Sequence, residues 1–279
     1  MSTLGTVYLV GAGPGAADLI TVRGAKLLAK ADIVFHDALV DPAMLELCPQ
    51  AVKVAVGKRC GKLSSAQEFI NKRLVDAAHQ YQTIVRLKGG DPMLFGRADE
   101  EITALENAGI AFEIVPGITA ALAGAASMQK SLTLRGVSRS VAFVTLAQAS
   151  EGIEANALQP IAKPSADTLV YYMGRKDAAK IAKQLMESSP NQTGNTPVHI
   201  LEAVSTHKER HWESTLQALA DGRANDWFDP SSPALILIGQ ALETLQTQQS
   251  KEGDLECPSP KINNGLQDSQ ILPHSRRSA

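Results

Sequence analysis

Two glycine-rich turns are the segments of this sequence best suited to bind a ligand. The first covers residues 11–15 and contains Pro14, and the second covers residues 88–92. Each follows a short apolar segment and precedes a segment with helical periodicity. Glycine lets the backbone approach a ligand closely, and proline removes an N–H donor. The two turns therefore predict a site for a small, partly anionic ligand.

The first turn also fits the spacing Gly11-x-Gly13-x-x-Ala16, which is found in dinucleotide-binding proteins. There, a pyrophosphate lies at the N-terminus of the helix that follows the turn. Pro14 lacks the N–H that such a ligand would use. This turn leaves open a nicotinamide-dependent oxidoreductase, and also a purely structural role for its glycines.

The segment 86–101 is the most specific pattern in the chain. Its glycines expose backbone amides, and Asp91 is placed to orient a neighbouring loop or a ligand hydroxyl. Arg97 and Glu100 are three residues apart and share one helix face. As a mere surface ion pair they would contribute at most about 0.5 kcal/mol. The composition of the whole segment favours a binding role.

The elements around these turns predict a mostly parallel sheet in the first half of the chain, because strand-like and helix-like segments alternate. The expected strands are residues 7–10, 33–35, 52–56, 84–87 and 112–115, and the expected helices are 18–30, 66–80, 99–108 and 118–126.

The second half has fewer helix-like segments between its strands, which predicts a mixed sheet. The expected strands are residues 140–146, 168–173, 198–201, 212–215 and 234–238, with the clearest helix at 176–186. We predict an N-terminal α/β domain over 1–117, a C-terminal α/β domain over 118–246 and a disordered tail over 247–279, with surface loops at 151–166 and 188–196.

The overall composition excludes several classes of protein. The chain has 279 residues, 44% apolar, and a formal net charge of −2, so it lacks the basic field of a nucleic-acid-binding protein. It has no apolar run of about 20 residues and no signal-peptide pattern, which predicts a cytoplasmic protein without membrane contact. Cys48, Cys60 and Cys257 have neither disulfide-framework nor zinc-site spacing.

One pair of histidines raises the question of a metal. His207 and His211 are four residues apart, a spacing that suits metal ligands. No third ligand of a suitable kind is evident nearby in the sequence, so the expectation is that the chain holds no metal.

Seven ordered motifs make the sequence resemble the tetrapyrrole methylase family, over nearly the whole chain to about Gly239. They lie at residues 7–15, 36–40, 56–59, 86–101, 115–120, 172–174 and 232–235. The resemblance implies an α/β fold of two domains with the active-site cleft between them. It also implies S-adenosylmethionine as methyl donor, with S-adenosylhomocysteine as product and no metal.

The resemblance further assigns residues to the cofactor pocket, matched position by position. These are Pro14, Gly89, Gly90, Asp91, Leu94, Thr119, Ala120, Met173 and Ala203. Apolar and backbone groups of this kind suit an adenine and a ribose.

The substrate implied by the resemblance is uroporphyrinogen III, methylated twice through precorrin-1 to precorrin-2 by a homodimer. Its carboxylates would meet Arg97 and Arg135, and Glu100 would hold Arg97 or meet a pyrrole N–H. Asp37 matches the proposed proton acceptor and Lys58 the proposed proton donor of the family. A loop-capping carboxylate and a simple cation for the substrate remain the plainer interpretations of these two residues.

The sequence also departs from the family pattern. Ala38, Leu134 and Ala147 stand where the family often has arginine, histidine and histidine, and His36 replaces a tyrosine. These departures keep two alternatives open. One is a methylase acting on another corrin precursor, and the other is a protein that binds S-adenosylmethionine or tetrapyrrole without turnover.

Overall fold

The computed structural model describes residues 4–56, 63–146 and 164–243 of the chain. These residues belong to one structural unit that ends at Glu243. Within the described residues, no helix is both long and apolar enough to cross a bilayer. The predicted loop at 151–166 falls largely outside this part of the chain, and the predicted tail falls wholly outside it.

The first sheet is entirely parallel. Its strands are β1 (Thr6–Gly11), β2 (Ile33–His36), β3 (Val52–Ala55), β4 (Thr83–Lys88) and β5 (Phe112–Val115). They lie in the order β3-β2-β4-β1-β5, so β4 and β1 occupy the centre. Continuous apolar runs in central strands are typical of parallel sheets covered on both faces. The predicted parallel sheet is confirmed.

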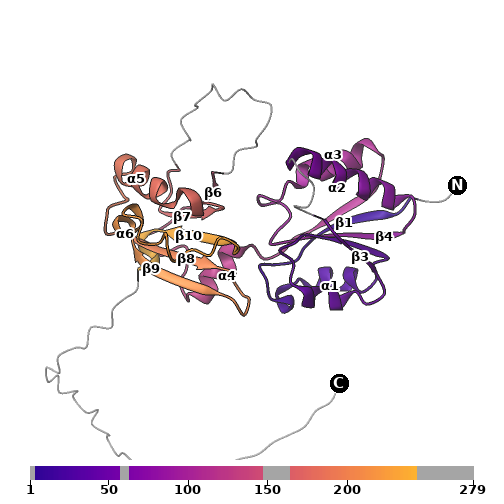
Figure 1. Ribbon diagram of the computed structural model, residues 1–279, viewed down its shortest axis with the longest axis horizontal. Helices are drawn as coiled ribbons and strands as arrows, with labels where there is room; N and C mark the ends of the chain where they lie inside the picture. The colour runs from indigo at the N-terminus through magenta and orange to yellow at the C-terminus, as the bar shows by residue number, and fades with distance from the viewer. Residues whose placement is uncertain (1–3, 57–62, 147–163, 244–279) are drawn as a thin grey trace, which may run out of the picture. The chain divides into compact units, whose positions relative to one another are not determined.

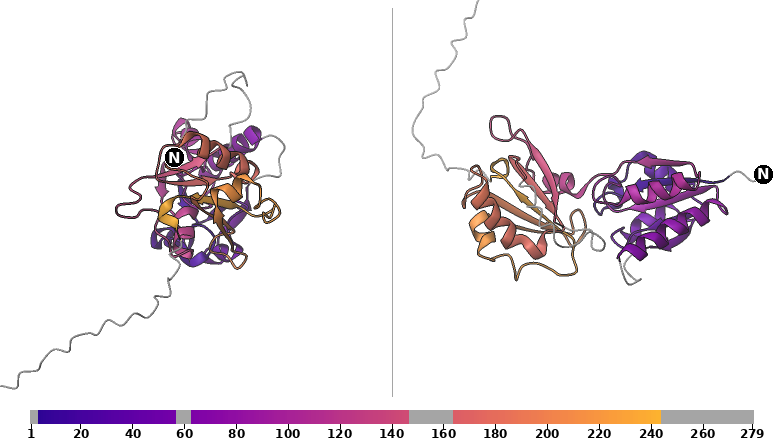
Figure 2. Two further views of the ribbon diagram at one scale, coloured as in Figure 1. Left: turned by 90° about the vertical axis from the view of Figure 1, so that its left-hand side faces the viewer. Right: turned by 90° about the horizontal axis from the view of Figure 1, so that it is seen from above.

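Helices cover both faces of this sheet (Figure 1). α1 (Val22–Leu28) packs on one face, and α2 (Leu63–Ala78) and α3 (Ala98–Asn107) pack on the other. The right-hand view in Figure 2 looks onto the face with α2 and α3. Because α3 follows β4 directly, its first turns lie next to the second glycine-rich turn.

The second sheet is mixed, as the sequence predicts. Its strands are β6 (Val141–Thr145), β7 (Thr168–Tyr172), β8 (Pro197–Glu202), β9 (Arg210–Thr215) and β10 (Ala234–Ile238). Their order is β6-β7-β10-β8-β9, and within this sheet only β6 and β7 are parallel. β8 and β9 form an antiparallel pair with β9 at the edge.

The helices of the second half also divide between two faces. α4 (Ala120–Ser127) packs on one face, and α5 (Ala178–Ser188) and α6 (Leu216–Ala220) pack on the other. The short 3-10 helix η4 (Gln240–Leu242) lies on the α4 face, where Leu242 is buried. The residue at which the chain divides into two domains stays a prediction.

Some predicted elements differ from the observed ones for local reasons. The helix expected over 18–30 is divided into η1 (Ala17–Leu19) and α1, because the Thr21 side chain caps α1 by accepting from the Gly24 N–H. The 3-10 helix η2 (Pro42–Leu47) and α6 were not predicted. Both are too short to show a clear apolar period.

Candidate functional site

The two predicted glycine turns are hydrogen-bonded to each other. Gly13 N–H donates to the Gly90 carbonyl at 3.1 Å, and Gly90 N–H donates to the Gly13 carbonyl at 2.7 Å. Ala12 N–H donates to the Lys88 carbonyl at 2.7 Å. These contacts form because β1 and β4 are parallel neighbours, so their carboxyl ends meet at one edge of the sheet. The sequence predicted both turns but not their direct pairing.

A third turn, after β5, joins the same edge. The Asp91 carboxylate accepts from Gly117 N–H at 2.9 Å through Oδ2 and from Met93 N–H at 2.8 Å through Oδ1. A Cβ on Gly117 would lie 2.3 Å from the Gly90 carbonyl oxygen and 2.8 Å from the Gly11 Cα. Asp91 therefore orients a neighbouring loop, one of the two roles predicted for it.

The edge of the second turn leaves room for a ligand. Gly90 has φ +71°, and a Cβ built on it would meet no atom within 4 Å. A Cβ on Gly89 would meet only Leu39, at 3.5 Å. Met173 and Ala203 have left-handed backbones, with φ 57° and 49°. Non-glycine residues in this conformation are strained and gather at functional sites, which fits a binding role for both residues.

Thr119 and Tyr172 form a polar contact at the start of α4. The Thr119 and Tyr172 hydroxyl oxygens lie 2.6 Å apart, and the Tyr172 oxygen also accepts from Ala121 N–H at 3.1 Å. The Phe95 ring lies 5.2 Å from the Tyr172 ring, and the Phe143 ring lies 6.1 Å from it. Burial raises the pKa of Tyr172. Tyr172 therefore contacts both the predicted residue Thr119 and Phe95, which lies three residues after the second glycine turn.

The chain that follows the first turn does not have the geometry of a dinucleotide site. Ala16 N–H donates to the Ser205 hydroxyl at 3.1 Å, and α1 begins only at Val22. A pyrophosphate would need a helix N-terminus next to the glycines. Only the three-residue 3-10 helix η1 follows the glycines directly, and the N–H of its N-cap residue Ala16 is already bonded to Ser205, which argues against the nicotinamide alternative.

A buried charge network lies beneath the turns, on the α3 face of the first sheet. Arg86 donates through Nε to Glu101 at 2.9 Å and through Nη2 to Asp37 at 2.6 Å, and Lys88 donates to Glu101 at 2.9 Å. Gln67 donates to the same Glu101 carboxylate at 3.3 Å. Glu101 is fully buried and both cations are 2% exposed. The network fixes the half-buried Asp37 carboxylate at the end of β2.

The network shifts the pKa values of both cations. Burial opposes the charge on Arg86, but the Glu101 and Asp37 carboxylates outweigh burial and raise its pKa. For Lys88, burial and the neighbouring Arg86 charge outweigh the attraction of Glu101 and lower its pKa. Sequence reasoning missed this network. The available signal was a pair of cations two residues apart, Arg86 in the predicted strand 84–87 and Lys88 directly after it, since residues two apart on a strand share a face.

Arg97 and Glu100 form the predicted pair at the start of α3. Arg97 donates to Glu100 through Nε at 2.6 Å and through Nη2 at 2.8 Å, and both side chains are 42% exposed. The two-point contact stretches over the first turn of the helix and keeps the guanidinium at the protein surface. Arg97 itself has a left-handed backbone with φ 54°.

The remaining predicted site residues make fewer contacts with the rest of the candidate site. Pro14 is half-buried in the first glycine turn, Leu94 is half-buried two residues after the second, and Ala120 is the first residue of α4. Arg135 is exposed in a turn closed by Leu134 and Ser138, and no hydrogen bond or ion pair within the described residues ties it to the other predicted site residues. Lys58 lies outside the described residues.

His207 and His211 do not form the pair that their spacing suggested. His211 instead lies 2.8 Å from His199, measured between His211 Nε2 and His199 Nδ1, and beside Glu213. His199 comes from the neighbouring strand, which the sequence spacing alone does not show.

Comparisons of the sequence with known proteins give a consistent result. Residues 6–220 match the family model described as Tetrapyrrole (Corrin/Porphyrin) Methylases. The uroporphyrinogen-III C-methyltransferase of Pseudomonas aeruginosa is 41% identical over 244 residues, covering 88% of this chain and 97% of that protein. The siroheme synthase of Chromobacterium violaceum is 42% identical over 240 residues, covering 86% of this chain and 50% of that protein. The chain thus spans about half the length of the siroheme synthases that it matches.

Solved structures of related sequence have the same fold. The uroporphyrin-III C-methyltransferase from Thermus thermophilus, complexed with S-adenyl homocysteine, aligns with a TM-score of 0.72 and 35% identity, covering 85% of this chain and 93% of that one. A cobalt precorrin-4 methyltransferase aligns with a TM-score of 0.69 and 27% identity, covering 86% of this chain and 96% of that one. The predicted α/β fold is confirmed.

Proposed function

Because the chain belongs to the tetrapyrrole (corrin/porphyrin) methylase family, we propose that it is an S-adenosylmethionine-dependent C-methyltransferase acting on uroporphyrinogen III. It transfers two methyl groups, through precorrin-1 to precorrin-2. The observation that carries the proposal is the edge of the first sheet, where two glycine turns are locked together and Gly90 faces open space. A relative of nearly equal length with this activity supports it.

The residues present fit the cofactor. The open side of Gly89 and Gly90 lets a ligand approach the backbone closely, since a side chain there would occupy the space. Met173 is 56% exposed, although it is a large apolar side chain, and it offers an apolar surface to an adenine or a methylsulfonium group. Pro14, Leu94, Thr119, Ala120 and Ala203 complete the proposed cofactor residues, with Asp91 holding the turns in place.

The donor supplies a methyl group on a positive sulfur, which is already an electrophile and needs no metal. The chain's own residues supply alignment and exclude water. Their precise spacing depends on the rigid turns, because misplacement of the reacting atoms by about 1 Å costs on the order of 100-fold in rate.

The proposed residues for the tetrapyrrole lie around the start of α3. Arg97 binds a substrate carboxylate while Glu100 holds its guanidinium, and Arg135 binds a second carboxylate. Asp37 accepts the one proton that the macrocycle loses for each methyl group it gains, and Lys58 would supply a proton only where a shift of a ring hydrogen removes another proton in exchange. Arg86 holds Asp37 through Oδ1, which makes Arg86 a positioning residue for the proposed base.

A homodimer and a cytoplasmic location are part of the same proposal. Both follow from the family resemblance. Light scattering coupled to size-exclusion chromatography of the purified chain tests the dimer, because a monomer mass at micromolar concentration contradicts it.

Anaerobic incubation of the purified chain with uroporphyrinogen III and S-adenosylmethionine tests the activity. Mass spectrometry of the tetrapyrrole is expected to show the gain of two methyl groups, with S-adenosylhomocysteine formed in step. Binding of S-adenosylhomocysteine without methylation of uroporphyrinogen III would overturn the proposal. That result would leave a methylase for another corrin precursor, or a protein that binds without turnover.

A further inference from the structure

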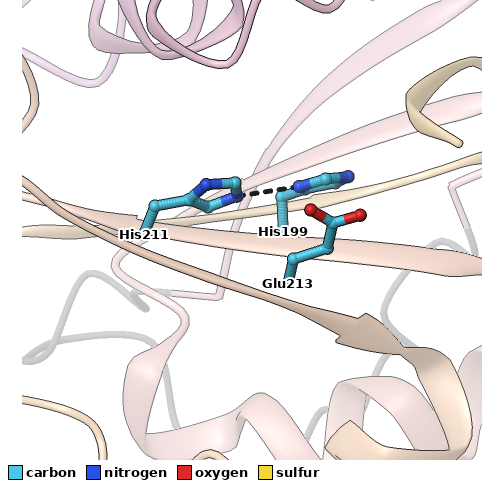
Figure 3. A group of neighbouring side chains, drawn as sticks. All are labelled: His199, His211 and Glu213. Carbon is cyan, nitrogen blue, oxygen red and sulfur yellow. Dashed lines mark hydrogen bonds between the residues drawn. The ribbon is translucent and has the colours of Figure 1, made fainter. Parts of the chain in front are cut away.

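Two histidines and a glutamate gather on the second sheet, and none of the three is used in the proposed function (Figure 3). His199 lies on β8, and His211 and Glu213 lie on the edge strand β9. Their nitrogen and oxygen atoms that could bind an ion all lie within 4.8 Å of one another. His199 is 1% exposed, whereas His211 and Glu213 are exposed.

Strand register brings these three side chains together. His199 is the direct partner of Glu213 in the antiparallel pair, and His211 is two residues before Glu213 on the same strand. Residues two apart on a strand share a face, and direct partners have Cβ atoms about 4.5–5.5 Å apart. Trp212, between the two β9 residues, packs on the opposite face with α5 and α6. The group is therefore fixed by backbone pairing rather than by a loop.

The hydrogen bonds of His199 leave one ring nitrogen directed at the group. His199 Nε2 lies 2.9 Å from the Leu242 carbonyl, which can only accept, so Nε2 carries the proton. Nδ1 then presents its lone pair toward His211 Nε2, 2.8 Å away (Figure 3). Metal-binding histidines almost always donate their second N–H to a carbonyl or carboxylate in this manner. The Leu242 contact fixes both the tautomer and the ring orientation.

We propose that His199 Nδ1, His211 Nε2 and the Glu213 carboxylate bind one divalent transition-metal ion of the zinc class. Two imidazoles and a carboxylate are a common donor set for zinc, with a water in the fourth position. Tetrahedral ligands about 2.0–2.2 Å from the ion are about 3.3 Å apart, so the two nitrogens need to separate by roughly 0.5 Å. His211 is exposed on an edge strand, where its side chain has room to make that adjustment.

The surroundings of the group contain charges of both signs. Lys130 donates to the Glu243 carbonyl at 2.9 Å and lies close enough to His199 to oppose a positive charge there. The Glu213 carboxylate favours a positive charge at the same place. The ion would cross-link β8 to β9 and hold η4 through His199. It has a structural role, because none of its ligands belongs to the proposed methyl-transfer site.

Calorimetric titration of the tag-free, chelator-treated full chain with Zn²⁺, in the presence of a phosphine reductant, tests the site. We expect one equivalent to bind and the melting temperature to rise by about 5–10 °C at a free Zn²⁺ concentration 100-fold above Kd. His211→Ala and Glu213→Gln should each weaken this binding by about 10-fold or more. Both residues are exposed, so the variants should fold.

His207→Ala is the matched control, because His207 is an exposed histidine four residues from His211 but outside the group. It should bind Zn²⁺ as the unaltered chain does, and all three variants should keep methyl-transfer activity. Absence of Zn²⁺ binding by the unaltered chain would overturn the proposal, since the three side chains would then form only a hydrogen-bonded group. Binding that survives His211→Ala and Glu213→Gln unchanged would overturn it equally, by locating the ion elsewhere.

Discussion

The two sheets provide partners for their buried polar side chains in different ways. In the parallel sheet, the cations of β4 find their carboxylate on α3, an element that packs across the face of the sheet. In the mixed sheet, His199 finds His211 and Glu213 on the adjacent strand, at positions fixed by antiparallel register. The first arrangement depends on tertiary packing, and the second depends on local strand pairing. Arg86, Lys88 and Glu101 are all buried, whereas His211 and Glu213 are exposed. Removal of one charged partner should therefore lower the free energy of unfolding far more in the first sheet.

The largest effect is expected from Glu101→Gln, which removes the one carboxylate shared by Arg86 and Lys88. Two buried cations then lose their main counter-charge, which should lower the free energy of unfolding by about 3–5 kcal/mol. Urea unfolding, followed by circular dichroism, measures this loss in the free energy of unfolding. Glu100→Gln is the control, because its exposed pair with Arg97 is worth at most about 0.5 kcal/mol. Equal losses in both variants would contradict the importance of the buried network.

A somewhat smaller effect is expected from Gly117→Ala, which tests the junction of the three turns. Its Cβ would lie 2.3 Å from the Gly90 carbonyl oxygen, and backbone cannot move aside cheaply. We expect a loss of about 2–3 kcal/mol in the free energy of unfolding and weaker binding of S-adenosylhomocysteine. Gly109→Ala is the comparison, because it adds left-handed strain of about 1 kcal/mol without a clash. Unchanged ligand affinity in Gly117→Ala would separate the junction from the binding site.

Arg97→Ala tests whether the tetrapyrrole and S-adenosylhomocysteine depend on different residues of the proposed site. Loss of a charge-assisted contact worth about 1.5–3 kcal/mol should weaken tetrapyrrole binding by roughly 10- to 100-fold. Affinity for S-adenosylhomocysteine should remain nearly the same. Fluorescence titration with the tetrapyrrole and calorimetry with S-adenosylhomocysteine measure the two affinities. An equal loss of both would show that Arg97 supports the whole site rather than the substrate alone.

The smallest effect is expected in the second half of the chain, from Tyr172→Phe. The Ala121 N–H and the Thr119 hydroxyl both lose a partner, which should lower the free energy of unfolding by about 1 kcal/mol. Thermal unfolding of the variant and of Tyr8→Phe provides the measurement, since no hydrogen bond of the Tyr8 hydroxyl is present within the described residues. If Tyr8→Phe lowered the free energy of unfolding more than Tyr172→Phe, the contact of Tyr172 with Thr119 and Ala121 would not be the cause of the loss.

Sequence patterns predicted both sheets, because strand spacing and apolar runs depend on local chemistry. They also predicted the Arg97 and Glu100 pair, whose members are three residues apart, and a loop-orienting role for Asp91, although not its contact with Gly117. The partnership of Arg86 with Glu101 was missed, since it depends on how α3 packs against β4. His199 was missed because its partners depend on strand register.

The position of β1 has a consequence for synthesis of the chain on the ribosome. β1 is made before the other strands of its sheet, yet it lies between β4 and β5, so Thr6 pairs with Thr83 and Val7 with Phe112. One edge of β1 stays without its neighbour β4 until residue 88 has left the exit tunnel, and the other stays without β5 until residue 115 has left it. At about 5–20 residues per second this interval lasts several seconds. A chaperone that binds short apolar segments should therefore contact residues 6–11 of the nascent chain, and release them once β5 has emerged.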